Sequence, residues 1–434
     1  MSSDTIFALG TGAGRTAIAV IRLSGPGVRA VLSEFAGSTP EPRVARLVEL
    51  RDPRDGETLD RGLTIFFPAP HSATGEDYAE FHVHGGRAVV GGVLAALSRR
   101  PGLRSAEPGE FARRGFANGK LDLSQAEALA DLVDAQTEAQ RRQALRIAGG
   151  ALRRRVEAWR AALIEALALV EAELDFSDEG DVSVFSADRL EALLQPVLSE
   201  IRAALEDAPA SERMRDGFLV MILGAPNAGK STLLNALARR DLAIVSPTPG
   251  TTRDMIEAHL DLGGLPVTFV DTAGLREAED EIEKIGVDRV VERVGTADLV
   301  LWLSEKGEEP SLDALGNIDL LRVWSKCDLH QSAQGWLGIC ATSSLGLDSL
   351  LNEIADRAGA RLGDGASALL IRERHRRAAE DAGKMIAAAL APEKDLEFVA
   401  DDLRSAGRSL GRIVGSVEVE DVLDAVFSHF CIGK

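Results

Sequence analysis

The sequence predicts a multidomain protein: a mixed α and β domain, then a helical domain into which a P-loop domain with a doubly wound sheet is inserted. Three observations lead to this fold class. Short strand-like segments fill the first part of the chain, long helical patterns follow, and a Gly-x-x-x-x-Gly-Lys-Ser motif opens a segment of alternating strands and helices. At 434 residues the chain has room for two or three domains.

Composition and charge narrow the classes of function. The 45% hydrophobic and 27% charged residues are typical of a globular protein. A net charge of −19 argues against general electrostatic binding to nucleic acid, although a local basic groove is compatible with it. Three separated cysteines without metal-ligand spacing indicate a reducing compartment. Because no export signal or membrane-spanning run is evident, we expect a cytoplasmic protein with no membrane contact.

Residues 1–118 show a mixed α and β pattern. Apolar or alternating segments bounded by turn residues predict strands, and one later segment predicts a helix; the strands are 17–23, 63–67 and 79–84, and the helix is 89–97. His82 and His84 share one strand face and could bind a metal. No third ligand stands at a related spacing, so two partly exposed histidines are the favoured interpretation.

Residues 119–214 and 361–434 predict the helical domain. An apolar stripe at spacings of four and three indicates a core helix in a bundle, with a bare coiled coil as the alternative; its members are Leu152, Val156, Trp159, Leu163, Leu167, Val170 and Leu174. A second helix is expected from 187 to 205. Polar stretches at 207–212 and 359–367 bracket the P-loop segment, which predicts an inserted domain of residues 215–360.

The P-loop motif follows an apolar strand that begins at Phe218 and precedes a helix-forming segment. Gly224 and Gly229 allow the backbone to curl so that its N–H groups face phosphates. Lys230 is expected to reach the β- and γ-phosphates, and the Ser231 hydroxyl to bind Mg²⁺.

Two further segments match the switch regions of nucleotide hydrolases. An apolar strand ends in Asp271-Thr-Ala-Gly274, where the aspartate can hold Mg²⁺ and the glycine N–H can meet the γ-phosphate. Thr252 in the earlier Gly-Thr-Thr-Arg-Asp segment is the candidate for a second hydroxyl on Mg²⁺. Leu275 stands where many small GTPases have a water-orienting Gln, so another group must orient the water.

The segment Ser325-Lys-Cys-Asp328 predicts the base-recognition loop. Asp328 can accept both guanine N–H groups, and the Lys326 stem can lie along the base, which favours GTP over ATP. Ser325 replaces the usual Asn and lacks the amide that would bridge the base and the P-loop. Cys340 likewise replaces a Ser in the loop that follows. We therefore expect altered guanine affinity or pocket rigidity with guanine preference retained.

Several motifs occur in an order that resembles the MnmE (TrmE) family of tRNA-modifying GTPases. They span nearly the whole chain and comprise Asp4-Thr-Ile6, Ile21–Pro26, Thr74–Asp77, His84–Gly86, Pro108–Phe111, Asn118–Asp122, Ser124–Ala128 and Cys431–Lys434. The resemblance implies a GTP site formed by Gly224, Asn227, Ala228, Gly229, Lys230, Ser231, Thr232, Thr251, Thr252, Asp271, Gly274, Ser325, Lys326 and Asp328.

The resemblance also implies metal ions and a catalytic residue in this domain. Mg²⁺ would be bound by Ser231, Thr252 and Asp271, and a K⁺ ion by Asn227. Glu283 would position the attacking water, whereas charge alone favours a solvated acidic run at 277–283.

In the N-terminal domain the resemblance implies dimerisation and a folate site. Arg22, Glu76 and Lys120 would bind 5-formyltetrahydrofolate or 5,10-methylenetetrahydrofolate. Cys431 would take part in the carbon transfer; from the residues alone, a small hydrophobe at a helix end is about equally compatible. The basic cluster 371–377 can contact RNA phosphates or form a solvated face.

Together the resemblance implies a homodimeric, potassium-activated GTPase. With an MnmG-type FAD protein, in a heterotetramer, it would add an aminomethyl or carboxymethylaminomethyl group to carbon five of the wobble uridine of certain tRNAs. A regulatory or ribosome-assembly GTPase that acts by binding alone is the alternative, and the family's N-terminal motifs and Cys431 argue against it. A P-loop ATPase is a third possibility, which nucleotide competition would separate.

Overall fold

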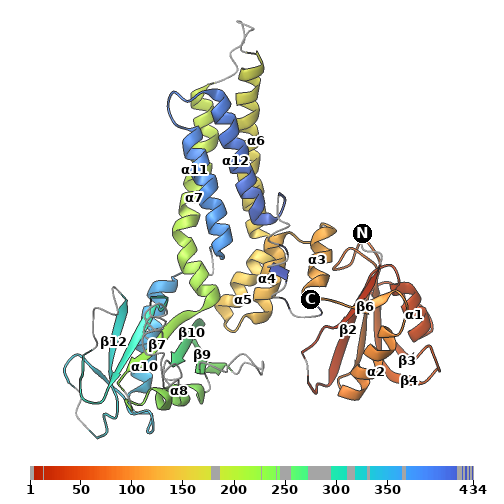
Figure 1. Ribbon diagram of the computed structural model, residues 1–434, viewed down its shortest axis with the longest axis horizontal. Coiled ribbons are helices and arrows are strands. Elements are labelled where there is room, and N and C mark those ends of the chain that lie inside the picture. Colours follow the sequence, from red (N-terminus) through yellow and green to blue (C-terminus); the bar gives the residue numbers. More distant parts are fainter. Residues whose placement is uncertain are drawn as a thin grey trace, which may run out of the picture. The chain divides into compact units, whose positions relative to one another are not determined.

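The computed structural model describes residues 4–433 except 13, 177–185, 226, 241, 245–255, 272–294, 310–317, 330–332, 364–367, 418–422, 424, 425, 428, 429, 431 and 432 (Figure 1). The chain divides into two compact units, each described by itself. The first comprises Met1–Ala130, Ala148–Arg160 and Gly407–Lys434, and the second comprises Asp131–Ile147 and Ala161–Ala406. Each unit is therefore built from segments that are far apart in the sequence.

The first unit contains a six-stranded sheet in the order β3-β4-β5-β2-β1-β6. Neighbouring strands are antiparallel except β1 and β6, which are parallel. Its elements are β1 (Thr5–Leu9), β2 (Ile18–Ser24), α1 (Val28–Ala36), β3 (Arg46–Arg51), β4 (Thr58–Phe67), β5 (Tyr78–His84), α2 (Arg87–Ser98), β6 (Leu103–Ser105) and α3 (Glu110–Ala117). The strands and helix expected before residue 98 are all present.

Strand alternation divides the side chains of this sheet between two faces. Apolar residues of one face pack with α1 and α2 in a core that includes Ile21, Phe35 and Phe81. On the other face a smaller cluster joins Ile6 and Tyr78 to Phe111 of α3. The part of this second face on β3 and β4 stays open, since Leu47 is 55% exposed there.

The C-terminal segment packs against α3 and α4 (Leu123–Asp134) within the first unit. Phe427 and Phe430 are buried in a cluster with Ala112, Leu123 and Ala126. At the N-terminus of α3, Gly109 has φ +69° and lies so close to this segment that a Cβ there would be 2.6 Å from the Phe427 carbonyl oxygen. Only glycine suits this approach, because both the backbone angle and the space exclude a side chain.

The helical part contains α4, α5 (Glu138–Ala148), α6 (Ala151–Phe176), α7 (Ala187–Asp216), α11 (Glu373–Ala389) and α12 (Leu396–Val414). Most of the predicted stripe of α6 is confirmed as core. Its buried members are Leu152, Val156, Trp159, Leu163 and Val170, whereas Leu167 and Leu174 are half-buried. Helices α7 and α11 pack closely at Gly383, and Arg404 of α12 forms an ion pair with Glu171 of α6 at 2.7 Å. These contacts define a helical bundle in the second unit (Figure 1).

Helix α7 is longer than the sequence predicts. It continues through Pro209 to Asp216, so the polar stretch 207–212 is helical and not a connection. Tertiary contacts explain the difference: Ala208 and Ser211 are fully buried, and the Gln143 amide of α5 donates a hydrogen bond to the Ser211 carbonyl at 3.1 Å. Burial and this bond offset the hydrogen bond that a proline removes from a helix.

The P-loop domain contains a seven-stranded sheet in the order β13-β12-β11-β7-β10-β9-β8. Strands β13 to β10 are parallel, and β9 and β8 continue the sheet in antiparallel fashion. Its elements are β7 (Phe218–Gly224), α8 (Lys230–Ala238), β8 (Ala243–Ile244), β9 (Ile256–Leu262), β10 (Leu265–Asp271), β11 (Leu299–Ser304), β12 (Asp319–Trp324), β13 (Leu337–Gly338) and α10 (Leu347–Leu362). Helices α8 and α10 pack on one core with the central strands.

Candidate functional site

The P-loop connects the carboxyl end of β7 to the first turn of α8, as the sequence predicts. Asn227 and Gly229 have φ +62° and +92°, so the loop curls back over its own backbone. The Lys230 ammonium donates to the carbonyl oxygens of Gly224 and Ala225 at 3.0 and 2.9 Å. Lys230 thus lies across the loop, with its charge at the place where phosphate oxygens are expected.

At the end of β7, Gly224 leaves the space that close packing against strand β11 requires. Its φ is +149°, and a Cβ at this position would lie 2.1 Å from the Leu303 carbonyl oxygen of β11. The two strands pair in parallel with Leu303 opposite Gly224. A larger residue would push the P-loop away from the sheet edge, so close strand packing fixes the position of the loop.

Two oxygen ligands for a divalent cation meet next to the P-loop. The Ser231 hydroxyl donates to Asp271 Oδ2 at 2.6 Å. Asp271 is the last residue of β10, is 2% exposed, and lies opposite Ile222 of β7. A hydroxyl and a carboxylate at this spacing are the ligand types that Mg²⁺ prefers.

The loop predicted to recognise the base follows β12 at the same edge of the sheet. Ser325 is buried, Lys326 has φ +53°, and Asp328 is exposed. Hydrogen bonds from Ser325 N to Ser304 O (2.9 Å) and from Cys327 N to Ile339 O (3.1 Å) hold the loop between two neighbouring segments. The Asp328 carboxylate is thereby available at the surface to accept the two N–H groups of guanine.

The two cysteines of this region have perturbed thiols. Burial raises the pKa of Cys327, and the neighbouring Cys340 and Asp328 add to this shift. Hydrogen bonds from Ser343 and Thr342 lower the pKa of Cys340, and the Thr342 hydroxyl lies 3.2 Å from its sulfur. Cys340 therefore takes part in the side-chain contacts of the loop that faces Asp328.

The remaining nucleotide-site residues have different positions. Ala228, which belongs to the P-loop, is buried, whereas Asn227 and Thr232 are exposed. Five residues named from the sequence lie outside the described residues: Thr251, Thr252, Gly274, Glu283 and Cys431.

In the first unit, Arg22 contacts the C-terminal segment. Its Nη1 donates to the Gly433 carbonyl oxygen at 2.9 Å, and its Nε lies 3.6 Å from Glu80 of β5. Gly433 has φ +96°, and a Cβ there would lie 2.3 Å from the Leu9 carbonyl oxygen. Gly433 thus lies against β1 and β2, beside the predicted folate residue Arg22.

Glu76 is held by a buried polar network. Its Oε2 accepts hydrogen bonds from the Ser24 hydroxyl at 2.8 Å and from the Arg114 guanidinium at 3.1 Å. Arg114 has a side chain only 7% exposed, and it also pairs with Asp4 and Glu110 at 2.9 and 3.0 Å. Arg114 was not predicted from the sequence. Its position four residues after Glu110 on a helix, where an ion pair can form, is the pattern that could have identified it.

The carboxylate of Glu110 is ionised more readily than usual. Burial acts to raise its pKa, but hydrogen bonds from Arg104, from the Glu107 backbone and from Arg114 outweigh it and hold the pKa below 4.5. Arg104 Nη2 lies 2.6 Å from Glu110. The network around Arg114 is therefore stabilised as long as its carboxylates are charged.

Lys120 lies close to Glu76 although it is far from it in sequence. Its side chain is exposed, and its stem packs against Gly75, where a Cβ would lie 3.3 Å from the Lys120 Cε. Gly75 has φ +78° and directly precedes Glu76, and the Asn118 amide donates to the Thr74 carbonyl at 2.7 Å. The fold therefore brings the 74–77 and 118–120 motifs together.

Other sequence candidates are paired with neighbouring side chains. His82 contacts Glu80 and His84 contacts Asp60, each at 2.9 Å. In the basic cluster, Arg372 pairs with Asp131 at 2.6 Å and Arg376 pairs with Glu212 at 3.2 Å. His375 is buried. The cluster is thus largely neutralised by carboxylates, which disfavours a role in binding RNA phosphates.

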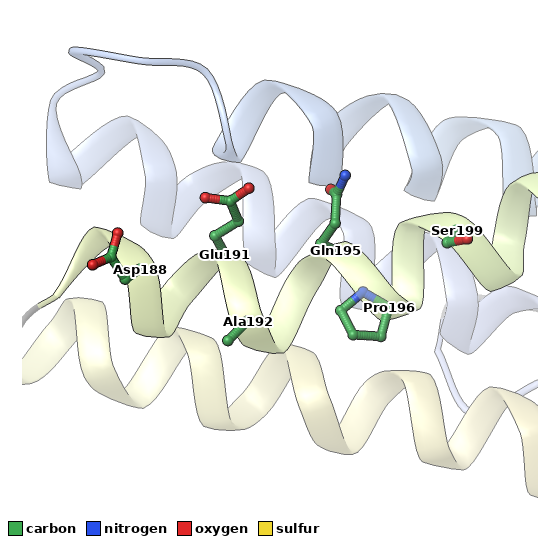
Figure 2. Close-up of a pocket in the computed structure, with 6 residues that line it drawn as sticks. All are labelled: Asp188, Glu191, Ala192, Gln195, Pro196 and Ser199. Carbon is green, nitrogen blue, oxygen red and sulfur yellow. The ribbon is translucent and has the colours of Figure 1, made fainter.

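A surface recess lies on α7 in the helical bundle (Figure 2). It is lined by Asp188, Glu191, Ala192, Gln195, Pro196 and Ser199. All six come from one helix, and the two charged groups are carboxylates, so the charge of the recess disfavours phosphate binding. Among the described residues, no helix has the length and hydrophobicity that crossing a membrane requires.

Comparison with known proteins covers almost all of the chain. Residues 5–120 match the model of the GTP-binding protein TrmE N-terminus, and residues 123–431 match the model of the MnmE helical domain. A tRNA modification GTPase MnmE of Beijerinckia indica subsp. indica is 51% identical over 433 residues, which cover 99% of this chain and 96% of that protein. The protein of that name from Azorhizobium caulinodans is 52% identical over 436 residues, covering 100% and 99%.

The strand, P-loop and helix, with Asp271 and Asp328 at the same sheet edge, define a P-loop GTPase whose nucleotide domain is inserted in a helical domain. The family matches extend over the N-terminal, helical and nucleotide-binding parts. The chain belongs to the MnmE (TrmE) family of tRNA modification GTPases.

Proposed function

We propose that this GTPase modifies carbon five of the wobble uridine in certain tRNAs, adding an aminomethyl or carboxymethylaminomethyl group. It acts in the cytoplasm as a homodimer, together with an MnmG-type FAD protein in a heterotetramer. GTP hydrolysis requires Mg²⁺, is activated by K⁺, and drives domain movements. We propose that the carbon chemistry takes place in the N-terminal domain, which lies in a different compact unit from the P-loop.

The observation that carries this proposal is the contact between Arg22 and the Gly433 carbonyl at 2.9 Å. Gly433 is two residues from Cys431 in the sequence. Because Gly433 lies against β1 and β2 and contacts Arg22, we propose that Cys431 acts in the N-terminal domain, where its thiol would be a nucleophile or proton carrier. Such a site would lie outside the nucleotide domain, as a separate carbon-transfer reaction requires.

The residues of this cluster fit a tetrahydrofolate, which supplies a one-carbon unit when bound. Glu76 uses Oε2 in its bonds to Ser24 and Arg114, and its Oε1 forms no hydrogen bond within the described chain. That oxygen can accept pterin N–H groups. The exposed Lys120 ammonium and the partly exposed Arg22 guanidinium suit the negative glutamate tail.

Residues in and next to the P-loop have the oxygen atoms that binding of Mg²⁺ and K⁺ would require. Ser231 and Asp271 offer a hydroxyl and a carboxylate 2.6 Å apart, and these oxygens would hold Mg²⁺. Asn227 is exposed at φ +62°, so its amide oxygen is accessible for K⁺. Lys230 keeps the loop carbonyls together and provides the positive charge for the β- and γ-phosphates. Glu283 is proposed to orient water.

The open face of the N-terminal sheet supports the proposed homodimer. Leu47 of β3 pairs with Leu63 of β4, and the two side chains are 55% and 39% exposed. His82 and Val20 continue this row across β5 and β2, and Ile18 next to Val20 on the same face is 60% exposed. Exposed apolar faces of this kind mark interaction sites, and we propose that a second copy covers it.

The test is mass spectrometry of nucleosides from digested tRNA in a strain that lacks the protein. We expect the carbon-five modification of wobble uridine to disappear and to return with the wild-type gene but not with Cys431→Ser. The same purified Cys431→Ser protein should keep near wild-type GTP hydrolysis. Unchanged nucleosides in the deletion strain would instead favour a GTPase that acts by binding alone, and full modification by Cys431→Ser would limit Cys431 to packing.

A further inference from the structure

Hydrogen bonds to one buried hydroxyl group, that of Ser304, hold the turn that follows β11. Ser304 ends β11 and is fully buried. Its Oγ accepts hydrogen bonds from the Lys306 N–H at 3.2 Å and from the Glu308 N–H at 3.0 Å. The Trp302 indole N–H donates to the Glu308 carbonyl at 2.7 Å and closes the other end of the turn. These bonds fix the backbone on both sides of Glu305.

This turn packs directly on the base-recognition loop. Gly307 has φ +77°, and a Cβ there would lie 2.9 Å from the Trp324 ring, next to Ser325. The Ser325 N–H donates to the Ser304 carbonyl at 2.9 Å. Backbone and ring contacts therefore hold the turn and the loop in one arrangement.

From this turn Glu305 reaches Lys326, the lysine expected to lie along the base. The Glu305 Oε2 and Lys326 Nζ atoms are 2.5 Å apart, and the side chains are 29% and 41% exposed. Next to Lys326, the buried Ser325 hydroxyl forms no hydrogen bond with the described residues. Within the described part of the chain, the loop therefore has no side-chain hydrogen bond from Ser325 but has an ion pair at Lys326.

We propose that Glu305 is a positioning residue for guanine recognition. It holds the Lys326 side chain over the base and thereby replaces the restraint that an Asn amide at position 325 would provide. Its carboxylate acts on the nucleotide through Lys326, whose ammonium it contacts. The inference rests on the chain being a P-loop GTPase and does not depend on the proposed tRNA chemistry.

The magnitude follows from the exposure of the pair. A partly exposed ion pair changes an equilibrium by a factor of roughly two to five, and its loss would appear in ground-state binding. Because Glu305 does not contact the γ-phosphate or water, kcat at saturating GTP should stay the same while KM rises.

The experiment compares the affinity of fluorescent GDP and the KM and kcat for GTP in four full-length proteins. These are wild type, Glu305→Gln, Ser325→Asn and the double variant. Glu305→Gln keeps the side-chain shape and removes the charge, and we expect it to weaken binding roughly two- to fivefold. In the Ser325→Asn background the same change should have little effect, since the amide supplies the missing restraint.

Glu309→Gln is the matched control. Glu309 pairs with Arg322 of β12 at 2.9 Å, and within the described residues it forms no ion pair with Lys326. It should leave KM and affinity unchanged. Unchanged affinity in Glu305→Gln would overturn the proposal. The same weakening in both backgrounds, or in Glu309→Gln, would also overturn it, since either result would indicate a general electrostatic or stability effect.

Discussion

Gly109→Ala should weaken the docking of the C-terminal segment on the N-terminal domain. Gly109 has φ +69°, and a Cβ would lie 2.6 Å from the Phe427 carbonyl oxygen and 3.1 Å from the Phe430 Cβ. Gly119 provides a matched control: its φ is +68°, and a Cβ there would have no neighbour within 4 Å. The two substitutions impose the same backbone strain, so their difference measures the contact with the terminal segment alone.

An L-residue in the left-handed region costs about 1–2 kcal/mol, which both variants share. Gly109→Ala adds an overlap with a backbone oxygen, and overpacking of this kind typically costs about 1–3 kcal/mol. Burial of one Phe side chain contributes roughly 1.5–3 kcal/mol. Two buried Phe side chains thus contribute about 3–6 kcal/mol. An overlap of about 1–3 kcal/mol removes a large part of the docking energy of Phe427 and Phe430, so the segment is displaced more often.

Hydrogen exchange followed by mass spectrometry measures this displacement. In Gly109→Ala, the peptide that carries Phe427 and Phe430 should exchange about 5- to 150-fold faster than in wild type, corresponding to about 1–3 kcal/mol. Gly119→Ala should leave that peptide unchanged, and GTP hydrolysis should persist in both proteins. Equal protection of the peptide in Gly109→Ala and wild type would refute the reasoning from Cβ distances.

Three further predictions concern the nucleotide and the Arg114 network. Asp328→Asn should weaken GTP binding and improve binding of xanthosine triphosphate, because the amide matches the altered base edge; equal turnover of ATP and GTP by wild type would contradict this. Hydrolysis should be faster in K⁺ than in Na⁺ at equal ionic strength, and Asn227→Ala should remove the difference; a wild-type rate that is insensitive to the cation rules this out. The lowered pKa of Glu110 stabilises the fold above pH 4.5, and this stability should be lost as pH falls through the lowered value. Glu110→Gln should flatten that part of the profile in acid unfolding, and an identical slope in both proteins would contradict the assignment.

Local sequence determined the parts of the site whose geometry depends on neighbouring residues. A P-loop needs a strand, a glycine turn and a helix in immediate succession, and all three are contiguous from Phe218 to Ala238. The apolar stripe of α6 is similarly local, because a helix places residues three and four apart on one face. These features were predictable since short-range backbone geometry fixes them.

Tertiary structure alone decided the parts that depend on distant residues. Pro209 and its polar neighbours suggested a connection, yet burial of Ser211 and its bond from Gln143 keep α7 helical. Arg372 belonged to a basic cluster in the sequence, but Asp131, which is 241 residues away, neutralises it. No local pattern records such a partner.

The candidate folate site in the N-terminal domain likewise combines residues that motifs identify with contacts that form only in the folded chain. Arg22, Glu76 and Lys120 could be named from motifs, whereas the buried Arg114 that holds Glu76 and the 411-residue separation between Arg22 and Gly433 appear only in the folded chain. The physical reason is that hydrogen bonds and ion pairs act over a few ångströms in space, independent of separation along the sequence. Periodicity and turn chemistry identify the elements, and packing decides which charges and carbonyl groups meet.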